Sequence, residues 1–96
     1  MGIAFKNQWV CTRQHEFSIK KWPDGVVVFD DATGHLHALS VSAASVLELM
    51  QPGVPLDAFQ LGWQLLEETP TEDDVEMVEN VLTEFSSLNL IQRVAV

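Results

Sequence analysis

The chain has 96 residues, of which 47% are hydrophobic, and it carries a formal net charge of −9 from 14 acidic and 5 basic side chains. This length and composition suit one small domain with a single core, and the sequence has no apolar run of the roughly 18 residues that a membrane helix needs. Because nucleic-acid binding depends mainly on lysine and arginine, the acidic balance argues against DNA or RNA as a partner.

The N-terminal half of the chain has the pattern of a three-stranded antiparallel meander. Phe17 to Trp22 alternates imperfectly, which suits an edge strand, and Val26 to Asp30 is apolar on both faces, as a central strand would be. A tight turn at Pro23 to Gly25, in which glycine accepts a positive φ, joins these strands, and a second turn ends at Gly34. His35 to Leu39 then forms the third strand and an edge of the sheet.

Short extended segments are expected on both sides of the central elements. Before the meander, a short strand or a strap packed on the core is predicted by Ile3, Phe5, Trp9 and Val10. Towards the C-terminus, Asn89 can end a helix in the left-handed conformation. Leu90 to Val94 then predicts a short terminal strand or an extended tail.

Two short helices are expected after the meander. Ser40 or Ser42 can cap the first, from Ala43 to Met50, because a serine side chain accepts hydrogen bonds from the free amides of a first turn. The second is expected from Ala58 to Glu68, entered at Pro55 or Asp57, and Gly62 within it permits a close helix crossing. A broad apolar face of this helix is made by Leu61, Leu65 and Leu66 with Phe59 and Trp63.

A third helix has the clearest start in the sequence. Thr71, followed three residues later by Asp74, resembles a capping box with Asp in place of Glu. Apolar residues then step by three or four and predict one stripe, formed by Val75, Val78, Leu82, Phe85 and Leu88. The opposite side is expected to carry Glu72, Glu76, Glu79 and Asn80.

The sequence contains no recognisable catalytic or metal-binding pattern. His35 and His37 lie two apart on one strand face and could share a metal, but zinc needs three or four ligands, so we expect no metal and no other cofactor. Cys11 with His15 lacks an oriented base and an oxyanion site at recognisable spacing, and acid pairs such as the one that begins at Asp30 are explained by solvated turns and helix starts. We therefore expect that the protein is not an enzyme. The lone cysteine cannot form an internal disulfide, which suits a cytoplasmic protein.

A meander followed by three helices predicts an α+β fold with a winged-helix-like arrangement, in which a small sheet packs against a three-helix cluster. Winged helices often bind DNA, and the helix that enters the groove then carries Arg, Lys, Asn or Gln aimed at bases and phosphates. Here the third helix carries Glu76, Glu79 and Glu84 and no base. That composition weighs strongly against DNA.

Three stretches of the sequence carry a family resemblance. They are WPDGVVVFDDATG at 22–34, HALS at 37–40 and AASVL at 43–47. Together with Leu-Asn-Leu-Ile at 88–91 they resemble the PqqD-like peptide chaperones, and most closely the branch found with kinases related to HPr kinase, the HPr-rel-A type. The family usually has glycine where this chain has Asn89, and both residues tolerate the left-handed conformation. The resemblance covers about residues 17–91 of a single domain, 1–96.

The resemblance implies a RiPP recognition element, which binds the leader part of a ribosomally made precursor peptide and presents it to a modifying enzyme, as in coenzyme PQQ synthesis. That enzyme would be a radical-SAM enzyme or a kinase- or transferase-related protein. The peptide would add as a strand to the exposed sheet edge and lie against the third helix, which is β-augmentation. Carried onto this chain, the expected binding residues are His35, Leu36, His37, Ala38 and Leu39 on the edge strand and Asp74, Val75, Val78, Glu79 and Leu82 on the third helix.

Other functions stay open at this point. The domain could be a winged-helix-like protein–protein interaction or regulatory module without a leader-peptide ligand. A weaker alternative is a metal-responsive module that uses His35 and His37. Because an unpaired edge strand is a template for pairing, a homodimer through the same edge is also plausible.

Overall fold

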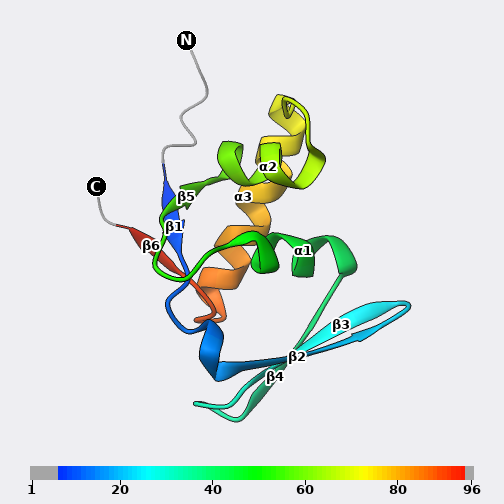
Figure 1. Ribbon diagram of the computed structural model, residues 1–96, viewed down its shortest axis with the longest axis vertical. Helices are drawn as coiled ribbons and strands as arrows, with labels where there is room; N and C mark the ends of the chain where they lie inside the picture. Colours follow the sequence, from blue (N-terminus) through cyan, green and yellow to red (C-terminus); the bar gives the residue numbers. More distant parts are fainter. Residues whose placement is uncertain (1–6, 95–96) are drawn as a thin grey trace.

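Within residues 7–94, three α-helices and two three-stranded antiparallel sheets make up the fold (Figure 1). The computed structural model describes residues 7–94. In chain order the elements are β1 (Gln8–Val10), the 3-10 helix η1 (Gln14–Glu16), β2 (Phe17–Trp22), β3 (Gly25–Asp30), β4 (His35–Leu39), α1 (Val41–Leu49), β5 (Leu56–Asp57), α2 (Ala58–Leu66), α3 (Glu72–Ser87) and β6 (Gln92–Val94). The α+β class predicted from the sequence is confirmed.

The larger sheet is the predicted meander, with strand order β2-β3-β4 and the valine-rich β3 in the middle. The turn before β4 ends at Gly34 with φ of +79°, as expected. The role predicted for Gly25 is wrong. Gly25 pairs with Trp22 as the first residue of β3, so the hairpin loop consists of Pro23 and Asp24 alone and needs no positive φ at Gly25.

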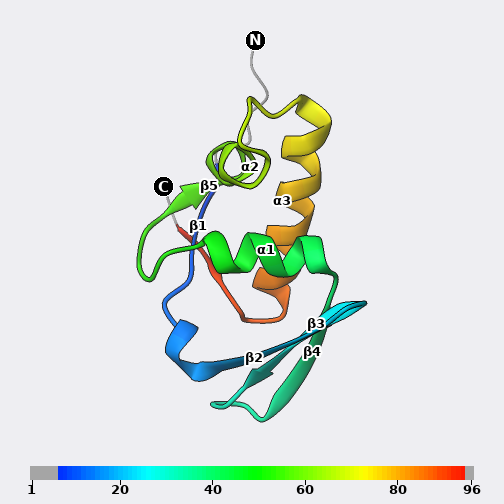
Figure 2. The same cartoon turned by 45° about the vertical axis from the view of Figure 1, so that its right-hand side comes forward.

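Among the residues that the structure describes, helices cover one face of this sheet and leave the other open. Along β3, Val26 and Val28 are buried, whereas Val27 and Phe29 are half-exposed, as the alternation of a strand requires. Figure 2 shows α1 lying across the covered face, with α2 on the other side of α1. β3 is therefore central in the order of strands, but the apolar character on both of its faces does not mean burial on both. The second face contributes to the site described below.

A second, smaller sheet joins three segments that are far apart in the sequence. β1 lies in its middle, and pairs Trp9 with Leu56 of β5 and with Arg93 of β6. The predicted short strands at Trp9 and Val10 and at the C-terminal end are confirmed, and Ile3 and Phe5 lie outside the described residues. β5 has only two residues and the sequence did not predict it. Such short strands exist here because each is held by a partner strand that folding brings from elsewhere.

The helices begin where short polar side chains can satisfy free backbone amides. The Ser40 hydroxyl accepts a hydrogen bond from the Ala43 amide at 3.1 Å, so α1 begins two residues before the predicted position. Asp57 and Thr71 each take part in a complete capping box, at the starts of α2 and α3. Asn89 follows α3 with φ of 62°, which confirms the left-handed residue. No helix within residues 7–94 combines the length and the apolar character that crossing a bilayer would require.

The core lies between α3, the other two helices and the covered face of the meander. The predicted stripe of α3 is confirmed, since Val75, Val78, Leu82 and Phe85 are buried. Gly62 of α2 lies close to Pro70, in the loop before α3, because a Cβ atom at Gly62 would be 3.3 Å from the Pro70 Cβ and 3.9 Å from the Val78 Cγ2 of α3. The broad apolar face predicted for α2 is divided in the structure. Its buried part is Ala58, Leu61 and Gly62, while Phe59 and Trp63 are exposed.

Candidate functional site

The candidate site is the outer edge of the meander at β4, which pairs with no further strand within residues 7–94. The pairing of the strands determines which of its backbone groups are open. The Asp31 amide donates to the Glu16 carbonyl at 2.8 Å, one position beyond the Phe17–Asp30 pair. Because hydrogen-bonded and non-hydrogen-bonded pairs alternate in an antiparallel ladder, every second residue of β3 from Phe29 backwards bonds to β2, and the residues between them bond to β4.

The same alternation extends to β4 itself. His37 and Leu39 lie opposite Val28 and Val26, so their backbone groups bond to β3. Leu36 and Ala38 therefore direct their N–H and C=O groups towards the open edge. Both side chains lie on the uncovered face of the sheet and are exposed, Leu36 to 66%. The edge thus offers two donors and two acceptors in the spacing that an added strand requires.

The covered face of β4 is less accessible. His37 and Leu39 are half-buried, and His35 is exposed at the start of the strand. The rings of His35 and His37 meet edge to face at a centroid distance of 6.2 Å. The His37 Nε2 atom is buried and has no hydrogen-bond partner within the described residues. Among residues 7–94, no group of three His, Cys, Asp or Glu side chains gathers where a metal could bind.

The structure does not bring the residues predicted on α3 to this edge. Val75, Val78 and Leu82 are core residues, with 0% of Leu82 exposed, so they cannot line an open groove. The Asp74 carboxylate accepts a hydrogen bond from the Thr71 amide at 2.9 Å as part of the helix cap. The prediction failed because the apolar stripe that makes α3 amphipathic is the same stripe that the domain needs for its core.

Glu79 also differs from its predicted place opposite the apolar stripe. Its carboxylate accepts hydrogen bonds from the Asn7 side chain at 3.1 Å and from the Trp9 indole at 3.3 Å, so it ties α3 to β1.

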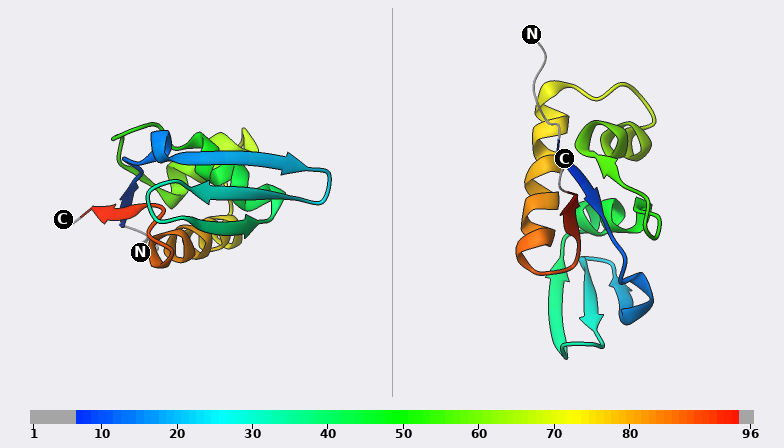
Figure 3. Two further views of the ribbon diagram at one scale, coloured as in Figure 1. Left: turned by 90° about the horizontal axis from the view of Figure 1, so that it is seen from below. Right: turned by 90° about the vertical axis from the view of Figure 1, so that its left-hand side faces the viewer.

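By helical spacing, the flank of α3 away from these contacts carries Met77, Val81 and Leu88. Met77 is exposed, and the other two are half-buried. Both views in Figure 3 place β4, rather than β2, on the side of the sheet where α3 lies.

A buried ion pair holds the end of the sheet from which β4 begins. Asp30 is buried and its carboxylate oxygens lie 2.7 and 2.8 Å from one Arg13 nitrogen. Arg13 also bonds to the Glu16 carboxylate and to the Asn89 carbonyl, both at 2.6 Å. Burial alone would raise the pKa of Asp30, but the hydrogen bond and charge of Arg13, together with the amides of Ala32 and Thr33, lower the pKa below its ordinary value.

The sequence assigned Asp30 to a solvated turn, and that prediction is wrong. The signal that would have found its burial is the alternation of β3, which places Asp30 on the same face as Val26 and Val28. Cys11 is also buried, and its thiol donates to the Leu90 carbonyl at 3.5 Å. Burial raises the pKa of this thiol and keeps it protonated, which disfavours a nucleophilic role.

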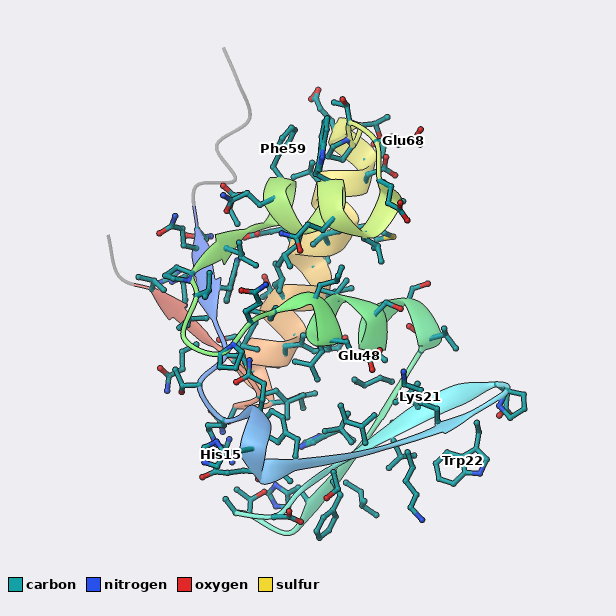
Figure 4. The ribbon with its side chains drawn as sticks, viewed as in Figure 1. His15, Lys21, Trp22, Glu48, Phe59 and Glu68 are labelled. Carbon is teal, nitrogen blue, oxygen red and sulfur yellow. The ribbon has the colours of Figure 1, made fainter. Side chains whose placement is uncertain are left out.

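The second face of the meander is uncovered within residues 7–94 and carries apolar side chains beside the exposed Ser18 and Lys20 of β2. The register places Val27 beside Ala38 and Phe29 beside Leu36 on this face, and Trp22 adjoins them with 51% of its surface exposed. Figure 4 shows Trp22 pointing away from the helices, whereas its neighbour Lys21 points towards α1, where its ammonium lies 2.8 Å from the Glu48 carboxylate. A shallow hollow of about 340 Å³ between the Trp22 end of the hairpin and Ala38 opens on the meander.

Comparisons with protein-family models, curated proteins and solved structures find no match for this chain.

Proposed function

We propose that this domain is a non-catalytic adaptor that binds an extended peptide as an additional strand on β4 and presents it to a modifying enzyme. The observation that carries the proposal is the open edge, because Leu36 and Ala38 both direct unpaired backbone groups outwards. Backbone hydrogen bonds would supply affinity, and the exposed Leu36 side chain beside them would contribute to the selection of alternate peptide residues.

The charge of the chain indicates which peptides would bind. With a net charge of −9, the domain attracts basic peptides over long distances and repels acidic ones. No base occurs in α3, so DNA is not the partner that we propose. The residues of the core stripe of α3 are not part of the proposed site, which consists of β4 and the neighbouring uncovered face.

A proline substitution tests the proposed edge. Ala38→Pro removes an N–H that points away from β3, so the meander keeps its own ladder while an added strand loses one hydrogen bond. The matched control is Ile19→Pro, because Ile19 lies on β2 opposite Val28 and directs its N–H to the other edge of the sheet. Peptides selected from a random library on the unmodified domain serve as ligands, and their affinities are measured by calorimetry.

We expect Ala38→Pro to lower the affinity for the selected peptides by about tenfold. This corresponds to roughly 1.4 kcal/mol, the loss of one hydrogen bond and of the contacts beside it. Ile19→Pro should leave the affinity unchanged. Amide hydrogen exchange of Leu36 and Ala38 should slow when peptide is bound. Equal affinities for a folded Ala38→Pro variant and the unmodified domain would exclude strand addition at β4.

The uncovered face of the meander favours a second candidate, a protein–protein interaction module that uses no added strand. Its Trp22, Phe29 and Leu36 side chains form an apolar surface of the kind found in interfaces. The same ligands distinguish the two functions. Leu36→Lys should abolish binding to the face, whereas Ala38→Pro should spare it.

A further inference from the structure

The exposed side of α2 carries aromatic residues that lie outside the hydrophobic core. Phe59 and Trp63 are four residues apart, are 47% and 48% exposed, and have ring centroids 6.4 Å apart. Leu66 continues the same stripe one turn further and is also exposed. Beside the two rings lies a hollow of about 220 Å³, which is also lined by Leu56, Gln60 and Gln64. Its volume is below the roughly 300 Å³ of small-molecule sites and suits a single apolar side chain.

Negative charge surrounds the C-terminal end of this stripe. Glu67 and Glu68 follow α2 directly, and the Glu67 amide donates to the Trp63 carbonyl at 2.8 Å. No ion pair within residues 7–94 involves either of these glutamates. The helix has no base in its last turn, so the negative end of its dipole adds to their charge. A cation close to Trp63 would therefore lie at an aromatic face and near a helix C-terminus that is followed directly by two glutamates.

We propose that this α2 surface, formed by Phe59, Trp63, Leu66, Glu67 and Glu68, is a docking site for a basic amphipathic segment of a partner protein. An apolar side chain of that segment fills the hollow beside the two rings, and a lysine or arginine next to it lies against the glutamates. The aromatic pair supplies the desolvated anchor that dominates most interfaces, and the acids supply steering and orientation.

Charge complementarity selects this occupant over the others. A second copy of the chain would bring acid against acid across a two-fold axis, because the same patch would meet itself. Anionic lipids and nucleic acids are repelled for the same reason. The α2 surface and β4 lie at opposite ends of the domain, as Figures 1 and 4 show, with Phe59 and Glu68 far from Trp22. Both surfaces can therefore be occupied at once, and the inference does not depend on the proposed peptide strand.

The probe for this inference is a synthetic helical peptide with leucines on one face and lysines on the other. Its affinity is measured by calorimetry, and the contacted residues are mapped by the chemical-shift changes of backbone amides. We expect the changes to centre on residues 58–68 and to leave β2 to β4 unaffected. Phe59→Ala and Trp63→Ala should each weaken binding by about tenfold or more, as for the anchors of other interfaces. Trp22→Ala is the matched control, since Trp22 is equally exposed but lies on the meander.

Charge-reversed variants separate local from global electrostatics. The double variant Glu67→Lys with Glu68→Lys should lower the affinity for the probe several-fold. The double variant Asp24→Lys with Asp31→Lys changes the net charge by the same amount and should lower this affinity less. The proposal would be overturned if the unmodified domain failed to bind the probe. It would also be overturned if a peptide with glutamates in place of the lysines bound with equal affinity. Retained affinity in the double variant lacking both aromatic side chains, or binding to vesicles of anionic lipid, would overturn it too.

Discussion

Replacing Gly62 with alanine and with valine should reveal how tightly α2 packs against Pro70, which precedes α3. Helix propensity favours both replacements, by about 1 kcal/mol for alanine and less for valine. The contacts oppose them, since an added Cβ would lie 3.3 Å from the Pro70 Cβ and 3.9 Å from the Val78 Cγ2. Alanine requires Pro70 to shift by a few tenths of an ångström, so we expect its gain and its cost to cancel to within about 0.5 kcal/mol.

Valine adds two further methyl groups to the same contact and should destabilise the domain. Overpacking of a filled interface costs roughly 1–3 kcal/mol, which exceeds the gain in helix propensity. For a domain of this size, each kcal/mol corresponds to about 4–8 °C in Tm. Urea unfolding followed by circular dichroism measures the difference, with Gln64→Val on the exposed side of α2 as the control for a β-branched residue in a helix. If Gly62→Val proved as stable as Gly62→Ala, the close approach of Gly62 to Pro70 would be refuted.

Two further predictions concern the end of the sheet where β4 begins. Because Arg13 lowers the pKa of Asp30 in the folded state, the stability from this pair is complete above the ordinary value of about 3.8 and is lost as the pH falls towards the lower folded-state pKa. Asp30→Asn should therefore lower Tm at neutral pH, and the Tm of this variant should decrease less as the pH falls. If the Tm of the variant decreased as steeply in acid as that of the unmodified domain, the ion pair with Arg13 would be contradicted. Asn89→Gly should leave the free energy of unfolding nearly unchanged and Asn89→Ala should reduce it by about 1 kcal/mol, because only alanine resists a positive φ. If urea unfolding gave the two variants equal free energies of unfolding, the backbone at position 89 would not need a positive φ for stability, and the prediction would be wrong.

Local chemistry made much of the fold predictable from the sequence. The capping box of Thr71 and Asp74 and the left-handed Asn89 each involve residues within a few positions of one another. The second sheet could not be predicted in the same way, because β5 consists of only two residues and is fixed by Trp9, which lies far away in the sequence.

The candidate site was predictable only in part, for the same physical reason. The edge position of β4 follows from the order of the strands, and sequence patterning showed it. The α3 residues were assigned wrongly because an apolar stripe is equally suited to a core and to a groove, and only the packing of α2 shows that Val78 belongs to the core. Asp30 was assigned wrongly because its partner Arg13 precedes it by 17 residues and approaches through tertiary structure.

The central position of β1 in the small sheet has a consequence for how the chain is synthesised. The ribosome makes Gln8–Val10 well before one neighbour of this strand, β6, which consists of Gln92–Val94. The N-terminal segment must therefore wait, with its Trp9 side chain unburied on that side, while more than 80 residues are added, at a rate of about 5–20 residues per second. The small sheet therefore cannot be completed until β6 has been made, so its assembly is a late step in the folding of this domain.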